Sequence, residues 1–136
     1  MFEKIRWKSD FETGVEEIDL QHHYFADLIN RLSRLLSSTD DKAFEARLLN
    51  ELIKYAQFHF VSEENLMYLM HYEGLQEHKK LHFDLLNMLN AKIGMFQQEM
   101  VGSDEVVGFL QEWFVMHTLV EDKKLAAFSK PQVNGS

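Results

Sequence analysis

The chain has 136 residues, of which 46% are hydrophobic and 26% are charged, and its formal net charge at pH 7 is -8. This length predicts one domain with a buried core, and the negative charge argues against nucleic acid or an anionic membrane surface as a partner. Cysteine is absent, which excludes disulfides and thiolate metal sites and leaves only nitrogen and oxygen ligands for any metal.

The sequence also carries no targeting or membrane-spanning pattern. No charged-then-apolar leader opens it, and no run approaches the roughly 20 apolar residues of a membrane span. A cytoplasmic protein is therefore expected, and its seven histidines are the unusual feature of its composition.

A non-helical arm is expected at residues 1–18. Its aromatic residues Trp7 and Phe11 recur without a helical period. Asp19 is assigned as the N-cap of the first helix, because its carboxylate can accept backbone N–H bonds at a helix start. That helix is predicted by residues that recur at spacings of three and four, namely His22, Phe25, Ile29, Leu32 and Leu36.

Three more helices follow, separated by short turns. The second is predicted at about 42–70, after the turn SSTDD, which also supplies its N-cap. The third is predicted at 75–100, after a break that contains a glycine. The fourth follows the turn VGSD, with Asp104 as its cap, and fades near Ser129, which leaves 130–136 as a tail.

Amphipathic helices joined by short connections predict an all-α fold. Short connections force neighbouring helices to be antiparallel, so the expected architecture is an up-down-up-down four-helix bundle. We expect residues 19–129 to form this bundle, as a single domain together with the arm.

Each predicted helix carries at least one histidine on its apolar side. These residues are His22, His59, His78 with His82, and His117. One inward histidine alone is usually a core residue with a single hydrogen-bond partner. Five imidazoles in one small core cannot all find partners, and each unsatisfied buried polar group costs about 1–3 kcal/mol. A metal centre satisfies all of them at once.

Carboxylates lie near these histidines. Glu63 follows His59 by four residues, which places both on one helix face, and a buried carboxylate needs a cation. Asp122 follows His117 by five residues, an offset of about 140° around a regular helix. Spacing therefore leaves Asp122 open between a ligand, reached from the flank or through a local helix distortion, and a solvated acid, with Glu121 as a rival.

Antiparallel register places all these residues at one end of the bundle. They lie early in the first and third helices and late in the second and fourth. Seven protein ligands exceed the six of one octahedral ion, so two ions are expected, with Glu63 and Asp122 able to bridge them. Zinc usually takes four ligands, whereas imidazole with carboxylate suits iron, and manganese or cobalt less well.

The chain resembles the hemerythrin family, in particular its single-domain bacterial members. The resemblance covers about residues 5–128 and includes all seven ligand positions of the family. Its motifs are Trp7 with GVEEIDLQH ending at His22, HFVSEE from His59, HKKLH from His78 to His82, and WFVMHTLVED from Trp113 to Asp122. It implies Asp122, and not Glu121, as the ligand from the fourth helix.

The resemblance also implies a division of the ligands between two non-haem iron ions. One iron would be held by His78, His82 and His117. The other would be held by His22 and His59. Glu63, Asp122 and a solvent-derived oxide or hydroxide would bridge them. The iron with two histidines would keep one vacant position, which a small diatomic molecule such as O2 or NO can occupy.

Reversible O2 binding for carriage, storage or delivery is the function that the resemblance implies, and not an enzymatic activity. Two alternatives from other classes stay open. One is an O2- or NO-reactive di-iron enzyme on the same site, and the other is an O2 sensor that acts through a separate partner. A recipient protein for the O2 or for a signal is expected in either the carrier or the sensor case.

Four aromatic residues near the ligands are expected to line the O2 pocket. They are Phe25, Phe60, Trp113 and Phe114, each of which can equally be an ordinary core residue. His23 and His71 match no ligand position and are interpreted as surface or loop residues. Glu64 is interpreted as a solvated acid, with a supporting contact to a ligand as the alternative.

Overall fold

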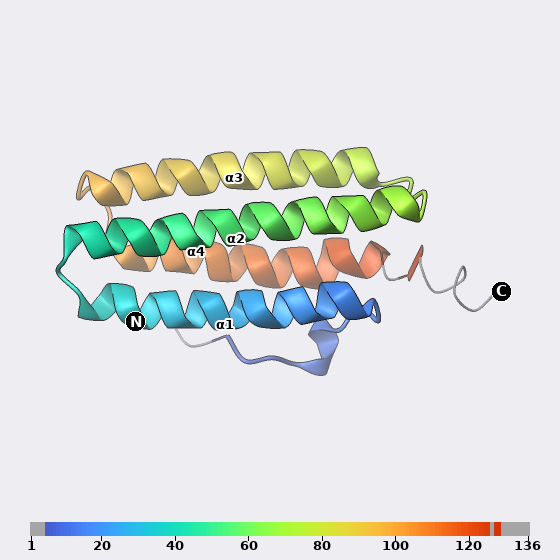
Figure 1. The fold of residues 1–136 in the computed structure, drawn as a ribbon, viewed down its shortest axis with the longest axis horizontal. Helices are drawn as coiled ribbons and strands as arrows, with labels where there is room; N and C mark the ends of the chain where they lie inside the picture. Colours follow the sequence, from blue (N-terminus) through green and yellow to red (C-terminus); the bar gives the residue numbers. More distant parts are fainter. Residues whose placement is uncertain (1–4, 126, 129–136) are drawn as a thin grey trace.

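Four long helices make up most of the chain: α1 (Glu16–Ser38), α2 (Lys42–Leu69), α3 (Leu75–Gln97) and α4 (Ser103–Met116). The computed structural model describes residues 5–125 and 127–128. Each helix runs antiparallel to the next, and the four pack in a ring in which α4 also contacts α1 (Figure 1). The predicted all-α up-down-up-down bundle is confirmed, and the described part of the chain contains no strand.

The predicted N-cap of the second helix is confirmed. Asp41 precedes α2, and its carboxylate accepts the backbone N–H groups of Ala43 and Phe44 at 3.0 and 3.2 Å. These bonds satisfy two donors that the first turn of a helix leaves without partners.

The predicted role of Asp19 as an N-cap is wrong, because α1 begins at Glu16 and its N-cap is Val15, four residues before Asp19. Asp19 lies in the first turn, and its carboxylate faces back to the preceding loop. It accepts hydrogen bonds from the Thr13 backbone N–H and hydroxyl at 2.8 and 2.7 Å and from the Gly14 N–H at 3.1 Å. Gly14 has a φ of 86°, a left-handed conformation that glycine adopts without strain.

Replacing Asp19 by alanine should lower the free energy of unfolding by about 2 kcal/mol, because it removes a charged acceptor from three donors at once. Thermal denaturation followed by circular dichroism measures this loss. Asp10 is an exposed acid of the same arm that makes no such contacts with the helix, so the matched change at Asp10 should leave the melting temperature nearly unchanged.

Other helix ends also differ from the sequence-based boundaries. The third helix ends at Gln97 and not at residue 100, and Glu99 adopts a left-handed φ of 61° in the turn. Asp104 is not the cap of α4: Gly102 holds that position, and Asp104 lies in the first turn, where its charge complements the helix dipole. The predicted fading at Ser129 and the tail at 130–136 lie outside the described residues.

The arm contains one helical turn where none was predicted. A short 3-10 helix, η1 (Ser9–Phe11), is closed by a bond from the Phe11 N–H to the Lys8 carbonyl at 2.9 Å. Phe11 is 4% exposed, and its ring meets the Phe114 ring of α4 at a centroid distance of 6.0 Å. Lys123 donates a hydrogen bond to the Glu12 carbonyl at 2.6 Å. The arm is thus held against α4 and against the segment that follows it.

Two apolar clusters divide the interior of the bundle. The larger runs through the middle and contains the predicted stripes of all four helices, including Phe25, Ile29, Leu32, Leu48, Leu52, Leu85, Leu89, Leu110 and Phe114. The smaller contains Ile18, Met67 and Leu125, each three or four residues beyond a predicted ligand toward the end of the bundle. A layer of polar side chains lies between the two clusters and is shielded from water on both sides.

Each helix buries its apolar stripe and exposes polar residues on its other face. Among the described residues, no helix is both long enough and apolar enough to cross a membrane.

Candidate metal centre

All seven predicted ligands meet in this polar layer, at the end of the bundle where α1 and α3 begin and α2 ends (Figure 1). None of them is more than 4% exposed. They are His22, His59, Glu63, His78, His82, His117 and Asp122. These residues lie at one end of the bundle, as predicted from the antiparallel register, because short connections bring the end of each helix beside the start of the next.

Glu63 is the centre of the cluster, and its two carboxylate oxygens face different histidines. Oε1 lies 3.0, 3.5 and 3.4 Å from the Nε2 atoms of His82, His78 and His117. Oε2 lies 3.6 and 3.4 Å from the Nε2 atoms of His22 and His59. The carboxylate thus separates a group of three histidines from a group of two.

Asp122 repeats this separation. Its Oδ1 lies 3.1 Å from Nε2 of both His78 and His117, whereas Oδ2 lies 2.9 Å from Nε2 of His22. Both carboxylates therefore direct one oxygen to each group. The three-histidine group gathers five donor atoms in this way, and the two-histidine group gathers four.

A π-helix explains how Asp122 reaches the layer. The segment η2 (His117–Glu121) follows α4, and the Asp122 N–H bonds to the His117 carbonyl, five residues back. A five-residue bond makes the turn wider than that of an α-helix, so Asp122 comes to lie one turn above His117. Glu121, the rival from spacing, lies at the partly exposed surface and pairs with Lys124 at 3.3 Å.

The spacing of the donor atoms fits metal coordination. Two ligands bound about 2.1 Å from one ion and at right angles to each other lie about 3 Å apart. The histidine–carboxylate separations of 2.9–3.6 Å match this geometry. Two sets of potential ligand atoms lie mutually close: Glu63 with His78, His82 and His117, and Glu63 with His22 and His59.

Unsatisfied polar atoms support the same interpretation. Among the described residues, the buried side-chain atoms without a hydrogen-bond partner are Nδ1 and Nε2 of His22, Oε2 of Glu63 and Oδ2 of Asp122. His22 Nε2, Glu63 Oε2 and Asp122 Oδ2 are donor atoms of the two-histidine group, and the fourth atom is the other ring nitrogen of His22. Although His22 Nε2 and Asp122 Oδ2 are only 2.9 Å apart, they do not point at each other as a hydrogen bond requires. A cation between them would satisfy both.

Without a metal the cluster is strongly ionised. Burial alone lowers the pKa of His22 and His117, but the nearby carboxylates of Asp122 and Glu63 outweigh it and raise these pKa values to about 9 and about 10. Burial opposes ionisation of Glu63, yet its histidine neighbours hold its pKa well below the usual range. Burial lowers the pKa of His59, which faces only one carboxylate oxygen at short range. The carboxylates are therefore ready to bind a cation.

Two residues contact predicted ligand histidines: Gln21, which was not identified from the sequence, and Glu64, for which such a contact was the alternative interpretation. The His59 Nδ1–H donates to Gln21 Oε1 at 2.8 Å, and the His82 Nδ1–H donates to Glu64 Oε2 at 2.8 Å. Glu64 is thus not a solvated acid, although its side chain is 23% exposed. Each of the two residues is next to a ligand in the sequence, and that adjacency was the available signal.

The four predicted pocket aromatics all lie beside histidine rings of the layer, and Phe60 contacts both groups, because its ring also lies 5.8 Å from that of His59. Phe114 lies 5.8 Å from the His22 ring and Phe25 lies 5.8 Å from the His59 ring, as centroid distances. Phe60 stacks on His82 at 4.0 Å, and Trp113 stacks on His117 at 4.4 Å.

His23 and His71 lie away from the cluster. Both are exposed, and His23 stacks on Trp7 of the arm at 3.7 Å.

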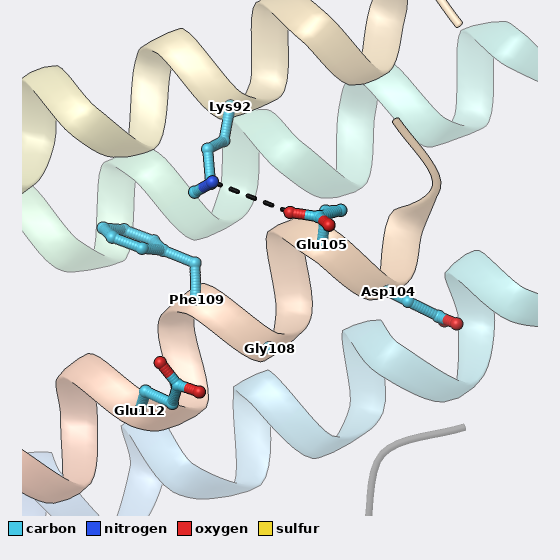
Figure 2. A pocket seen from close by; sticks show the side chains of 6 residues that line it. All are labelled: Lys92, Asp104, Glu105, Gly108, Phe109 and Glu112. Atoms are coloured by element: carbon cyan, nitrogen blue, oxygen red, sulfur yellow. Dashed lines mark ion pairs between the residues drawn. The ribbon is translucent and has the colours of Figure 1, made fainter. Parts of the chain in front are cut away.

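The bundle also has a surface hollow of about 400 Å³ between α3 and α4, far from the histidine layer (Figure 2). Its Lys92 pairs with Glu105 at 3.7 Å and lies 5.7 Å above the Phe109 ring, as Figure 2 shows. The charge of Lys92 is therefore balanced by Glu105, and the hollow does not adjoin the histidine layer.

Comparison with known proteins agrees with this geometry. Residues 13–128 match the model of the hemerythrin family, described as the hemerythrin HHE cation binding domain. The chain is 31% identical over 116 residues to a bacteriohemerythrin of Pseudomonas aeruginosa, which covers 85% of this chain and 75% of that protein. It is 30% identical over 122 residues to a myohemerythrin of Theromyzon tessulatum, which covers 90% of this chain and 91% of that protein.

Comparison with solved structures indicates the same family. A crystal structure of a wild-type hemerythrin matches with a TM-score of 0.80 and 26% identity, over 90% of this chain and 95% of that chain. The helical bundle, the buried histidine–carboxylate layer and the family match over most of the chain lead to one conclusion. This chain belongs to the hemerythrin family and is a hemerythrin of the bacterial type.

Proposed function

We propose that this protein binds O2 reversibly at a di-iron centre held by the seven residues of the histidine–carboxylate layer. One observation carries the proposal: each carboxylate directs one oxygen to the three-histidine group and the other to the two-histidine group. Two ions placed in these groups would share both carboxylates. The ion beside His22 and His59 would have one protein ligand fewer, and so an open position.

The donor set suits iron. Five imidazoles with two carboxylates are the mixed nitrogen and oxygen ligands that iron accepts, and they exceed the four ligands that zinc usually takes. Two ferrous ions bound there would supply the electrons for reversible O2 binding. The residues of the chain would fix the positions of the ions, and the two carboxylates would supply part of the negative charge that balances them.

The surroundings favour binding over further reaction. The layer is closed by the apolar cluster of Ile18, Met67 and Leu125 on one side and by Phe25 and Phe114 on the other. This enclosure keeps bulk water and protons away from the open position. Only two carboxylates face the pair of ions, which is less anionic charge than the four of ferritin-like centres and stabilises higher iron oxidation states less. Carriage or storage is therefore proposed, and not an enzymatic activity.

The open position would lie on the side of the two-histidine group, so we propose Phe25 and Phe114 as its walls. Trp113 packs instead on the ring of His117, and Phe60 stacks on the ring of His82 while also lying 5.8 Å from that of His59. A cytoplasmic location and a protein recipient of the O2 stay predictions.

A matched pair of substitutions separates these roles. Phe114→Leu keeps the site apolar but opens space beside His22, so the oxygenated protein should decay to the ferric form several-fold faster. Trp113→Leu, beside His117 of the three-histidine group, should change the decay rate much less. Following the visible spectrum of each variant after exposure to air measures both rates. Equal acceleration in the two variants would contradict the assignment of the pocket wall.

The proposed function is tested by anaerobic reconstitution. The metal-free protein is loaded with ferrous iron, which should bind at two ions per chain. Admitting O2 should then produce a visible charge-transfer band, and flushing with argon should remove it, through several cycles. A band that never appears, or one that appears and cannot be reversed, would overturn the proposal of reversible binding. Steady consumption of O2 in the presence of a reductant would instead favour the enzymatic alternative.

A further inference from the structure

Two ligand histidines are held by neighbours of different charge. The Nδ1–H of His82, in the three-histidine group, donates to the carboxylate of Glu64, and the Nδ1–H of His59, in the two-histidine group, donates to the amide oxygen of Gln21. Both bonds measure 2.8 Å. Because a carboxylate and an amide oxygen only accept, each fixes the proton on Nδ1 and leaves Nε2 free for a metal.

The orientation of Gln21 is fixed by two further contacts. Its Nε2 donates to the Ser62 hydroxyl at 2.8 Å, so Oε1 is the atom that faces His59. The Tyr55 hydroxyl donates to the backbone carbonyl of Gln21 at 3.0 Å. Gln21 is therefore held on α1 by two residues of α2, on either side of the histidine that it contacts.

The contact between Glu64 and His82 is likewise held by neighbouring residues. Glu64 lies on α2 beside Glu63 and reaches across to His82 on α3. Phe60 stacks on the imidazole of His82, and the two rings are 5° from parallel. The imidazole plane is thus set by the aromatic ring, and its Nδ1–H by a charged acceptor.

We propose that Glu64 and Gln21 are positioning residues that give the two metal positions unequal electron supply. This inference rests on the proposed di-iron function. A carboxylate that accepts the Nδ1 proton increases the negative charge on the imidazole and makes it a stronger donor, whereas a neutral amide does so much less. The ion in the three-histidine group is therefore the one stabilised in its oxidised form. The ion with the open position is the weaker electron donor, which favours release of a bound ligand over its reduction.

The test replaces the charged neighbour by a neutral one at His82, and the neutral neighbour by a charged one at His59. Glu64→Gln should weaken the tighter of two Co²⁺ binding steps of the metal-free protein about 10–100-fold, because the three-histidine position has more donors and loses its support. It should also raise the midpoint potential of the iron-loaded protein. Gln21→Glu should tighten the weaker Co²⁺ step and lower the potential, and the Ser62 hydroxyl can rotate to donate to the new carboxylate. We expect shifts of at least about 59 mV, equivalent to a tenfold change in the ratio of oxidised to reduced protein.

Opposite signs in the two variants are the signature of charge, since a purely structural role would weaken metal binding in both. The double exchange keeps the net charge and should reverse the order of electron supply. Glu112→Gln, an exposed acid of the hollow in Figure 2, is the matched control and should shift neither quantity. Circular dichroism of each metal-free variant checks that the bundle is retained.

The outcomes are distinguishable. Shifts of the midpoint potential that have the same sign in the two variants, or that are no larger than in the control, would overturn the inference. Uptake of two metal ions by the unsubstituted chain would then leave the proposed function standing. Uptake of fewer than two Co²⁺ ions by the unsubstituted chain would contradict the proposed function, and this inference with it.

Discussion

Replacing Glu63 by alanine should abolish binding of both metal ions. Glu63 is the residue that all five cluster histidines approach, through two oxygens that face opposite groups. Its loss removes one donor from each metal position at once and half of the shared negative charge. Since residues that only orient ligands are worth about 10–100-fold in metal affinity, loss of a shared ligand should cost more than about 100-fold at each position.

Metal content after reconstitution and desalting measures this effect, by elemental analysis per chain. Glu63→Gln is the informative companion, because it keeps the shape but offers one neutral oxygen, so at most one ion should stay bound. Glu112→Ala should retain two ions. Two ions per chain in Glu63→Ala would show that the carboxylate is not shared between the metal positions.

Removing the metal should lower the melting temperature by about 10 °C or more. A ligand at 1,000 times its Kd stabilises the folded state by about 4 kcal/mol, and two ions are bound only in the native arrangement. Without them, the native core must bury seven polar side chains, of which His22, Glu63 and Asp122 contain atoms without partners. Chelation followed by thermal denaturation measures the difference, and coincident melting curves of the two forms would contradict it.

The effect of metal removal should also depend on pH. In the metal-free protein the pKa values of His22 and His117 are raised to about 9 and about 10, from 6.5. Their contribution to stability is complete below about pH 6.5 and is lost as the pH rises toward these values. The lowered pKa values of Glu63 and Asp122 act in the other direction, so their contribution is lost as the pH falls below about 4.

Metal binding reverses the first of these trends. Imidazoles must lose their protons to bind a metal, so a rising pH favours the loaded form. The melting temperatures of the loaded and metal-free forms should therefore diverge between about pH 6 and about pH 8.5. Melting curves at several pH values within this range measure the gap, and a gap that narrows with rising pH would contradict the proposed imidazole ligation.

Much of the fold followed from local patterns in the sequence. The three- and four-residue spacing of apolar side chains located all four helices, because a helix must bury one continuous face. The turn SSTDD was recognised as the source of an N-cap, and Asp41 fills this role through local contacts to residues two and three positions ahead. Asp19 was misassigned because its partners, Thr13 and Gly14, precede it in a loop whose path no periodicity describes.

The position of Asp122 shows where spacing reached its limit. A five-residue offset from His117 is unfavourable in an α-helix, and only the resemblance to a family selected Asp122 over Glu121. The structure supplies the physical reason, a π-helix whose five-residue hydrogen bond places the two side chains one turn apart. A π-helix has no distinctive residue pattern, so the local sequence could not predict it.

The sequence by itself therefore determined the four helices, their antiparallel order and the gathering of histidines at one end, because these depend on periodicity and on short connections. The tertiary structure alone decided which oxygen of Glu63 and of Asp122 faces which histidine, and that Glu64 and Gln21 contact His82 and His59. These contacts join different helices, and they are fixed by the distances between helix axes and by the rotation of each helix, neither of which the order of residues encodes locally.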